Sequence, residues 1–184
     1  ACTAGSRVYI QEKIYDKVLN GAVEKLSKLK MGNALDEESD IGAIISEEQL
    51  KRTLHYMDIA KQTSSAKVVH GGNQPTGGDY KNGFFYEPTL MSGVPVDSPV
   101  CQEEIFGPVA CAIPFKTFEE VMQSANDTPF GLSAVLWTQN LSRALEFVED
   151  IEAGFVQVNQ CVAPRANVSY GCLLYTSPSP RDRQ

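Results

Sequence analysis

Along this chain, segments with helical periodicity alternate with short, nearly continuous apolar segments, and this alternation limits the fold more than any other feature. Residues 6–11 alternate polar and apolar side chains, which predicts a strand. From Ile14 to Leu29 the apolar positions recur at the spacing of an amphipathic helix. The same reasoning predicts further elements in the order helix 47–60, strand 66–70, strand 84–86, strand 109–115, helix 118–125, strand 134–138, helix 141–153 and strand 155–158. The pattern indicates an α/β domain with a largely parallel sheet flanked by helices.

Cap signals mark the starts of three of these helices. Gln49 follows Ser46 by three residues, and Glu120 follows Thr117 at the same spacing, which is that of a capping box. Asn140 stands immediately before the last helix, where its side chain is expected to act as an N-cap.

The middle of the chain is rich in turn-forming residues. Residues 71–83 contain several glycines, but neither the GxxxxGK[ST] order nor the GxGxxG order is present. We therefore expect a loop or hairpin connection there. After Val94, three prolines are expected to break regular structure.

The composition limits the classes of partner and function that this chain can have. The 184 residues are 42% hydrophobic, which suffices to bury a core in one or two domains. A formal net charge of −7 argues against nucleic acid as a partner. No apolar run approaches the roughly 20 residues that span a bilayer, so no membrane partner is expected. The five cysteines are irregularly spaced and do not form a metal-binding motif, which favours reduced thiols in an intracellular compartment.

Two places could carry chemistry. Cys2 is followed by small residues that allow a backbone to bend closely around a substrate, although no histidine accompanies it. Glu103 and Glu104 are adjacent carboxylates, and neighbours on an extended chain point to opposite faces, so at most one of them faces a site. Cys111 shares a strand face with Val109 and Ile113, and we expect it to be buried.

Five motifs in order resemble the aldehyde dehydrogenase superfamily, and the resemblance spans residues 1–171. The motifs are residues 2–8 (CTAGSRV), 85–90 (FYEPTL), 103–109 (EEIFGPV), 126–132 (NDTPFGL) and 154–159 (GFVQVN). The resemblance implies that residues 1–171 are a piece of the catalytic domain that begins at its nucleophile.

The resemblance also implies roles for single residues. Cys2 matches the catalytic thiol, Glu104 matches the carboxylate that hydrogen-bonds the nicotinamide-ribose hydroxyls, and Phe106 would pack beside the ribose and nicotinamide. The entrance for the aldehyde would be lined by Val162, Pro164 and Tyr170. The implied cofactor is NAD or NADP, without a metal. The implied setting is a homo-oligomer, dimeric or tetrameric, in the cytoplasm, with the mitochondrion as an alternative.

Both ends of the chain depart from the family pattern. The family places its general-base glutamate, a second oxyanion donor and its pyrophosphate-binding domain upstream of the nucleophile, and this chain contains none of them. Residues 172–184 are rich in Ser, Pro and Arg without an apolar face, so we expect them to be disordered. The stretch 172–182 resembles a translated sequencing-library adapter, which places the end of the native sequence near Gly171.

Two other functions remain open at this point. An acylating semialdehyde dehydrogenase would pass the thioester to an acceptor other than water. A non-catalytic protein could keep the fold for a structural purpose, although it would have no physical need for the Cys2 thiol.

We predict that the 184 residues expressed alone do not oxidise aldehydes, because the base that activates water and the coenzyme domain are absent from them. The measurement is NADH formation by the purified chain beside its Cys2→Ala variant. Formation above that of the variant would contradict the prediction.

Overall fold

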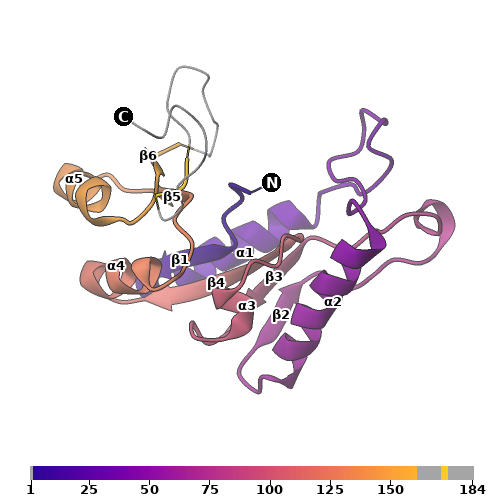
Figure 1. Ribbon diagram of the computed structural model, residues 1–184, viewed down its shortest axis with the longest axis horizontal. Coiled ribbons are helices and arrows are strands. Elements are labelled where there is room, and N and C mark those ends of the chain that lie inside the picture. Colours follow the sequence, from indigo (N-terminus) through magenta and orange to yellow (C-terminus); the bar gives the residue numbers. More distant parts are fainter. Residues whose placement is uncertain (1, 161–170, 174–184) are drawn as a thin grey trace. The chain divides into compact units, whose positions relative to one another are not determined.

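The computed structural model describes residues 2–160 and 171–173, which divide into two compact units. One unit is Ser6–Phe115, and the other combines Ala1–Gly5 with Lys116–Gln184. The α-helices and strands, labelled in Figure 1, are β1 Arg7–Gln11, α1 Tyr15–Leu26, α2 Glu47–Gln62, β2 Lys67–His70, β3 Thr89–Ser92, α3 Pro99–Gln102, β4 Val109–Phe115, α4 Phe118–Asn126, β5 Ser133–Leu136, α5 Leu141–Asp150 and β6 Phe155–Val158. Short 3-10 turns form at Glu12–Ile14 and Gly78–Tyr80.

The Ser6–Phe115 unit is built on a four-stranded sheet in the order β1-β4-β3-β2. β4 pairs in parallel with both β1 and β3, with Cys111 opposite Arg7 on one side and Met91 on the other. β2 lies at the edge and is antiparallel to β3. The largely parallel sheet is thus confirmed. The antiparallel edge is possible because the 71–88 connection contains no crossover helix, which a parallel partner would require.

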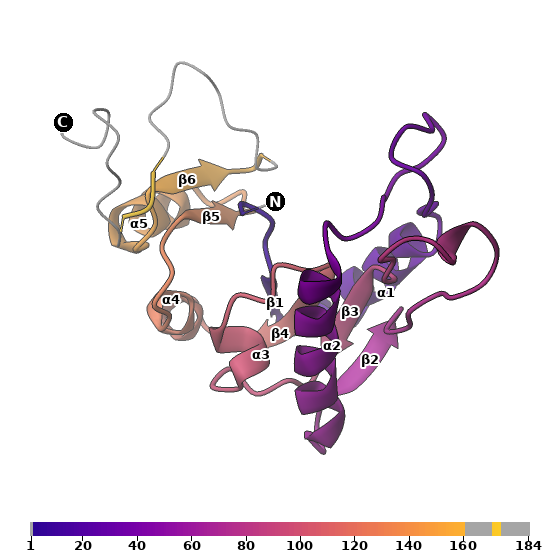
Figure 2. The same cartoon turned by 45° about the vertical axis from the view of Figure 1, so that its right-hand side comes forward.

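Alternate residues of β3 and β4 point to opposite sides of this sheet, and both sides are buried in apolar clusters. Met91 and Cys111 join the cluster that includes Met57 of α2, which is fully buried. Their neighbours Leu90 and Ala112 belong to a second cluster, which packs against α1. Figure 2 shows α2 in front of the strands and α1 behind them. The expected burial of Cys111 together with Val109 and Ile113 is confirmed.

The prediction of a strand at residues 84–86 was wrong, because the strand begins later, at Thr89. Phe85 and Tyr86 are buried in irregular backbone, so their apolar character reflects packing and not strand pairing. The prolines after Val94 also allow a short helix, α3. Pro99 stands in its first turn, where a missing N–H costs nothing, and Ser98 caps it.

The caps of the predicted helices form at all three places, but one forms only in part. Thr117 and Glu120 make the full capping box of α4, and the Asn140 side chain accepts from the backbone N–H of Arg143 in α5. The Ser46 hydroxyl accepts from the backbone N–H of Gln49, but the Gln49 side chain does not return to Ser46. It donates instead to the carbonyl oxygens of Ile105 and Phe106.

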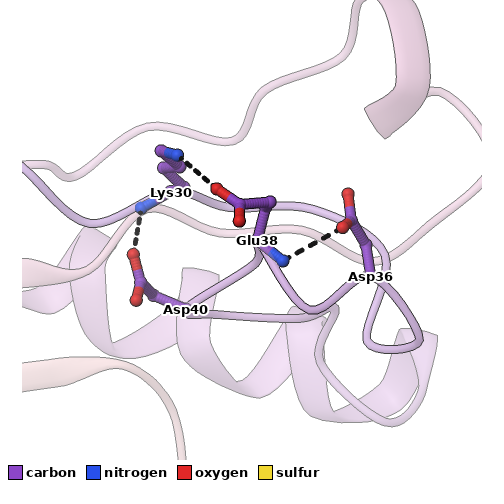
Figure 3. A network of polar contacts seen from close by, with 4 residues as sticks. All are labelled: Lys30, Asp36, Glu38 and Asp40. Atoms are coloured by element: carbon purple, nitrogen blue, oxygen red, sulfur yellow. Dashed lines mark hydrogen bonds and ion pairs between the residues drawn. The ribbon is translucent and has the colours of Figure 1, made fainter.

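An acidic loop between α1 and α2 is held by its own hydrogen bonds (Figure 3). The Lys30 backbone N–H donates to the Asp40 carboxylate at 2.9 Å, and its ammonium group pairs with Glu38 at 3.0 Å. The Glu38 N–H donates in turn to Asp36 at 3.0 Å. The ion pair is mostly exposed, so its contribution to stability is small.

No helix among the described residues is long and apolar enough to cross a membrane.

Gly93 directly follows β3, and a substitution there tests whether the close approach of two backbone segments requires glycine. Its φ is +65°, and a methyl group there would meet the backbone carbonyl oxygen of Ser65. We expect Gly93→Ala to lower the free energy of unfolding by about 1–3 kcal/mol, measured by urea denaturation.

The control is Gly21→Ala on α1, where the added carbon meets nothing within 4 Å. Because alanine favours a helix, this change should raise the free energy of unfolding by about 0.5–1 kcal/mol. Equal midpoints for the two variants would contradict the role assigned to Gly93.

Candidate functional site

The segment 103–107, which joins α3 to β4, separates the two adjacent glutamates. The Tyr56 hydroxyl on α2 donates to the Glu103 carboxylate at 2.6 Å. Burial, and then this bond to Glu103, raise the pKa of Tyr56 above its usual value, so the phenol keeps its proton and remains a donor at neutral pH. Glu104 is exposed, and nothing within residues 6–115 bonds its carboxylate. The two adjacent carboxylates thus have different partners within this unit.

The backbone of this loop is also held by α2. The Arg52 guanidinium donates twice to the carbonyl oxygen of Glu104, from Nε at 3.0 Å and from Nη2 at 2.6 Å. The Gln49 amide donates to the carbonyl oxygens of Ile105 at 2.7 Å and Phe106 at 3.1 Å. The carbonyl groups of three successive loop residues are therefore fixed by two side chains of one helix.

Phe106 adopts a backbone conformation that is unusual for an aromatic residue. Its φ is +56°, which costs on the order of 1–3 kcal/mol outside glycine, and the residue is 51% exposed. Next to it, a side chain at Gly107 would collide with the hydroxyl of Thr53, which is fully buried on α2. The loop thus approaches the helix closely at Gly107 and presents Phe106 outward.

We name Gln49, Arg52 and Tyr56 the α2 clamp. They are separated by three and four residues, the spacing that places side chains on one helix face. The sequence reasoning missed this role and assigned Gln49 to a capping box. The missed signal was the polar i, i+3, i+7 series beside the buried positions Leu50 and Met57.

Cys2 belongs to the other unit, with Ala1–Gly5 and Lys116–Gln184, whereas Glu104 and Phe106 belong to Ser6–Phe115. The Cys2 thiol is exposed and lies in a turn. The Ser133 hydroxyl of β5 donates to the carbonyl oxygen of Thr3 at 3.5 Å, which ties this turn to the β5–β6 pair. Glu104 and Phe106 therefore share one loop of the Ser6–Phe115 unit, whereas Cys2 belongs to the other unit.

Two other cysteines are buried in the Ser6–Phe115 unit. Cys101 on α3 and Cys111 on β4 have adjacent thiols, and the hydrogen bond to Cys101 together with burial raises the pKa of Cys111 well above its usual range. A thiol that keeps its proton is a poor nucleophile, so Cys111 is a packing residue.

Three of the five motifs, residues 85–90, 126–132 and 154–159, contain a side chain that hydrogen-bonds the backbone of another segment. The Asn126 amide donates to the Asp150 carbonyl oxygen at 2.8 Å and accepts from the Glu152 N–H at 3.0 Å. The Asn159 side chain bonds both the N–H and the carbonyl oxygen of Thr138, at 2.8 and 2.7 Å.

In the FYEPTL motif, the Thr89 hydroxyl accepts from the Gly72 N–H at 2.9 Å and donates to the Glu87 carbonyl oxygen at 2.7 Å. The Glu87 carboxylate accepts from the side chain of Asn73 at 2.9 Å. These bonds connect the end of the 71–88 segment to its beginning. The motif therefore shapes the connection between β2 and β3.

The predicted substrate-loop residues Val162, Pro164 and Tyr170 lie outside the described residues, as does Cys161. Within the described residues, no group of three or more His, Cys, Asp or Glu side chains is arranged to hold a metal ion.

Comparison with known proteins identifies the class to which this fold and loop belong. Residues 1–172 match the aldehyde dehydrogenase family model. The chain belongs to the aldehyde dehydrogenase family.

Individual relatives support this assignment. The chain is 40% identical over 171 residues to a D-glyceraldehyde dehydrogenase (NADP(+)) from Picrophilus torridus, covering 92% of this chain and 34% of the relative. It is 36% identical over 170 residues to a betaine aldehyde dehydrogenase from Mesorhizobium japonicum, covering 92% and 35%. The crystal structure of betaine aldehyde dehydrogenase from Staphylococcus aureus in complex with NAD+ matches with a TM-score of 0.89 and 33% identity, covering 93% of this chain and 34% of that one. The chain thus spans about a third of the length of these relatives.

Thiol labelling tests the contrast between the cysteines. We expect iodoacetamide to modify Cys2 in the native chain much faster than Cys101 or Cys111, because only Cys2 among these three is exposed. Peptide mass spectrometry gives the rate at each site, and the same reaction in denaturant provides the control in which all three react. Equal native rates for Cys2 and Cys111 would contradict the structure.

Proposed function

We propose that this chain is the nucleophile-bearing part of the catalytic domain of an NAD(P)-dependent aldehyde dehydrogenase, which oxidises an aldehyde to a carboxylic acid. The observation that carries the proposal is the arrangement of side chains on the 103–107 loop. Its one carboxylate without a partner in residues 6–115, Glu104, stands beside the exposed ring of Phe106 on a backbone held by α2. The family match over residues 1–172, which includes Cys2, supports the same function.

Cys2 supplies the nucleophile in this proposal. Its exposed thiol, once ionised, attacks the carbonyl carbon of the aldehyde, and a carbon–sulfur bond forms. The oxygen then carries a negative charge that needs preorganised donors, one of which is the backbone N–H of Cys2 in this family. Departure of hydride from the same carbon leaves a thioester on Cys2. Water activated by a carboxylate from another segment hydrolyses the thioester and restores the thiol.

The residues of the loop fit the coenzyme. A carboxylate accepts hydrogen bonds from neighbouring hydroxyl groups, and Glu104 has its oxygens available for a ribose. Phe106 offers an aromatic surface of the kind that packs against a flat ring. When bound, the coenzyme supplies the acceptor for the hydride, while the protein supplies binding and orientation.

The proposal extends to the coenzyme, the assembly and the aldehyde entrance. One similar protein is named for NADP(+), and a similar structure was solved with NAD+, so we propose either coenzyme. The family resemblance adds a homo-oligomer in the cytoplasm. Val162, Pro164 and Tyr170 are proposed to line the aldehyde entrance.

The proposal is tested on the complete reading frame, obtained by sequencing the source transcript outward from both ends of this chain. We expect the purified complete protein to reduce NAD or NADP with an aldehyde and to release the acid. Cys2→Ala should lower kcat on the order of a thousandfold or more, because it removes the nucleophile. Glu104→Gln should raise the KM for the coenzyme by about tenfold, because an uncharged amide accepts hydrogen bonds more weakly.

Glu48→Gln is the control for Glu104→Gln, because it removes the same charge from an exposed position on α2. Reduction of the coenzyme without release of acid would indicate an acylating enzyme. If the wild-type protein neither reduces the coenzyme nor is protected by aldehyde and NAD(P) against alkylation of Cys2, the proposed function is wrong and a structural role takes its place.

A further inference from the structure

We infer that Cys101 and Cys111 form a redox-sensitive dithiol, which a hydroperoxide converts into a disulfide that weakens coenzyme binding by displacing the loop after α3. The two thiols come from different elements, α3 and β4, and they lie in hydrogen-bond contact within one apolar cluster. Neither takes part in the reaction proposed for Cys2. Formation of the disulfide does not depend on the proposed function, whereas its effect on the coenzyme rests on the role proposed for Glu104 and Phe106.

The two thiols differ in how readily they lose a proton. The hydrogen bond from Cys111 lowers the pKa of Cys101, burial acts against this effect, and the Arg7 guanidinium adds to the lowering. The bond to Cys101 and burial instead raise the pKa of Cys111. Cys101 is therefore the thiol that ionises first, and the thiolate is the nucleophilic form of a cysteine.

The reaction consumes one molecule of a hydroperoxide. The Cys101 thiolate attacks its terminal oxygen, the O–O bond breaks, and the products are a sulfenic acid on Cys101 and an alkoxide, which takes up the proton that Cys101 released. A sulfenic acid no longer holds a negative charge beside Cys111, so one cause of the raised pKa of Cys111 is removed. The Cys111 sulfur then attacks the Cys101 sulfur, and the hydroxyl group leaves with the Cys111 proton as water. The two thiols lose two electrons, and the hydroperoxide gains them to become an alcohol and water.

The oxidant reaches the pair through α3. Both thiols are buried, so part of the unit has to open before they can react. β4 lies between β1 and β3, and opening it at Cys111 would break strand pairing on two sides. α3 has only the four residues Pro99–Gln102, and the residues 104–106 after it are in neither a helix nor a strand. Because such a segment opens at a lower free energy than a central strand, Cys101 is exposed first.

Closure of the disulfide changes the position of the 103–107 loop. The two sulfur atoms must approach to about 2.05 Å, well inside the distance of a thiol hydrogen bond. Cys111 is held on the central strand, so the shift falls on α3. Glu104 follows Cys101 by three residues in the chain. A shift of α3 therefore moves the start of the loop and alters the arrangement of Glu104 and Phe106 that is proposed to bind the coenzyme.

Peptide mapping of the complete protein shows whether the bond forms. The protein carries Cys2→Ala, is treated with tert-butyl hydroperoxide, and its remaining thiols are blocked with iodoacetamide in denaturant. Trypsin leaves both cysteines in one peptide, residues 82–116, which contains no internal lysine or arginine. Endoproteinase Glu-C then cuts this peptide after Glu103 and Glu104, between the two cysteines. We expect the two parts to stay joined in the oxidised sample and to separate after reduction with dithiothreitol.

The binding of NADH or NADPH, measured by fluorescence titration, shows the effect on the coenzyme. The Cys2→Ala background is kept, so oxidation of the nucleophile cannot contribute. We expect the hydroperoxide to raise the Kd severalfold and dithiothreitol to restore it.

Cys101→Ala and Cys111→Ala are the matched controls, because each removes one sulfur of the pair. The Kd of either variant should not respond to the oxidant. Two variants are used because Cys111→Ala alters the core on β4, whereas Cys101→Ala changes only the one-turn helix.

The inference is overturned if the two parts of the peptide separate without reduction, or if Cys101 is oxidised only to a sulfinic or sulfonic acid. It is also overturned if the disulfide forms while the Kd stays the same, or if the control variants respond to the oxidant as their parent does. A wild-type protein that binds neither NADH nor NADPH contradicts the proposed function, and the effect on the coenzyme falls with it. The peptide map then still decides whether the dithiol is oxidised to a disulfide.

Discussion

Burial of both faces of the β1-β4-β3-β2 sheet is the constraint on which the Ser6–Phe115 unit depends. Because successive residues of β4 alternate between the two sides, Cys111 packs toward α2 and Ala112 toward α1. Apolar contacts on the Cys111 side fix the position of α2 along the strands, with Met57 completely excluded from solvent. A helix fixed in this way can hold a neighbouring loop, since its polar edge cannot shift without disturbing the core.

The α2 clamp carries that rigidity to the 103–107 loop. Binding sites work best when their residues are held by a second layer of contacts, because little freedom is then lost when a ligand arrives. Here the clamp bonds the loop through its backbone and through the Glu103 carboxylate, and it makes no bond to the side chains of Glu104 and Phe106. The left-handed conformation of Phe106 persists in this setting, as expected where the surroundings determine the backbone.

The motifs differ in what they do, and the sequence alone did not separate these roles. The segments around Cys2 and Glu104 present exposed reactive groups, whereas Asn126, Asn159 and Thr89 bond the backbone. Such a bond needs a side chain of a particular length and chemistry at a particular position. A structural requirement can therefore restrict the residue types in a motif as strictly as a catalytic requirement does. A strong family motif is therefore not by itself a sign of catalysis.

The sequence by itself determined the order of most elements, because periodicity and caps are local: β4 and β6 form at the predicted residues, and Thr117 caps α4 as expected. It also determined the family, through motifs that lie in order. Only the tertiary structure decided that β2 runs antiparallel at the sheet edge and that Gln49 and Arg52 hold the loop. The hydrogen bond from Arg52 to Glu104 joins residues 52 positions apart, and such partners meet only after α2 has packed on the sheet.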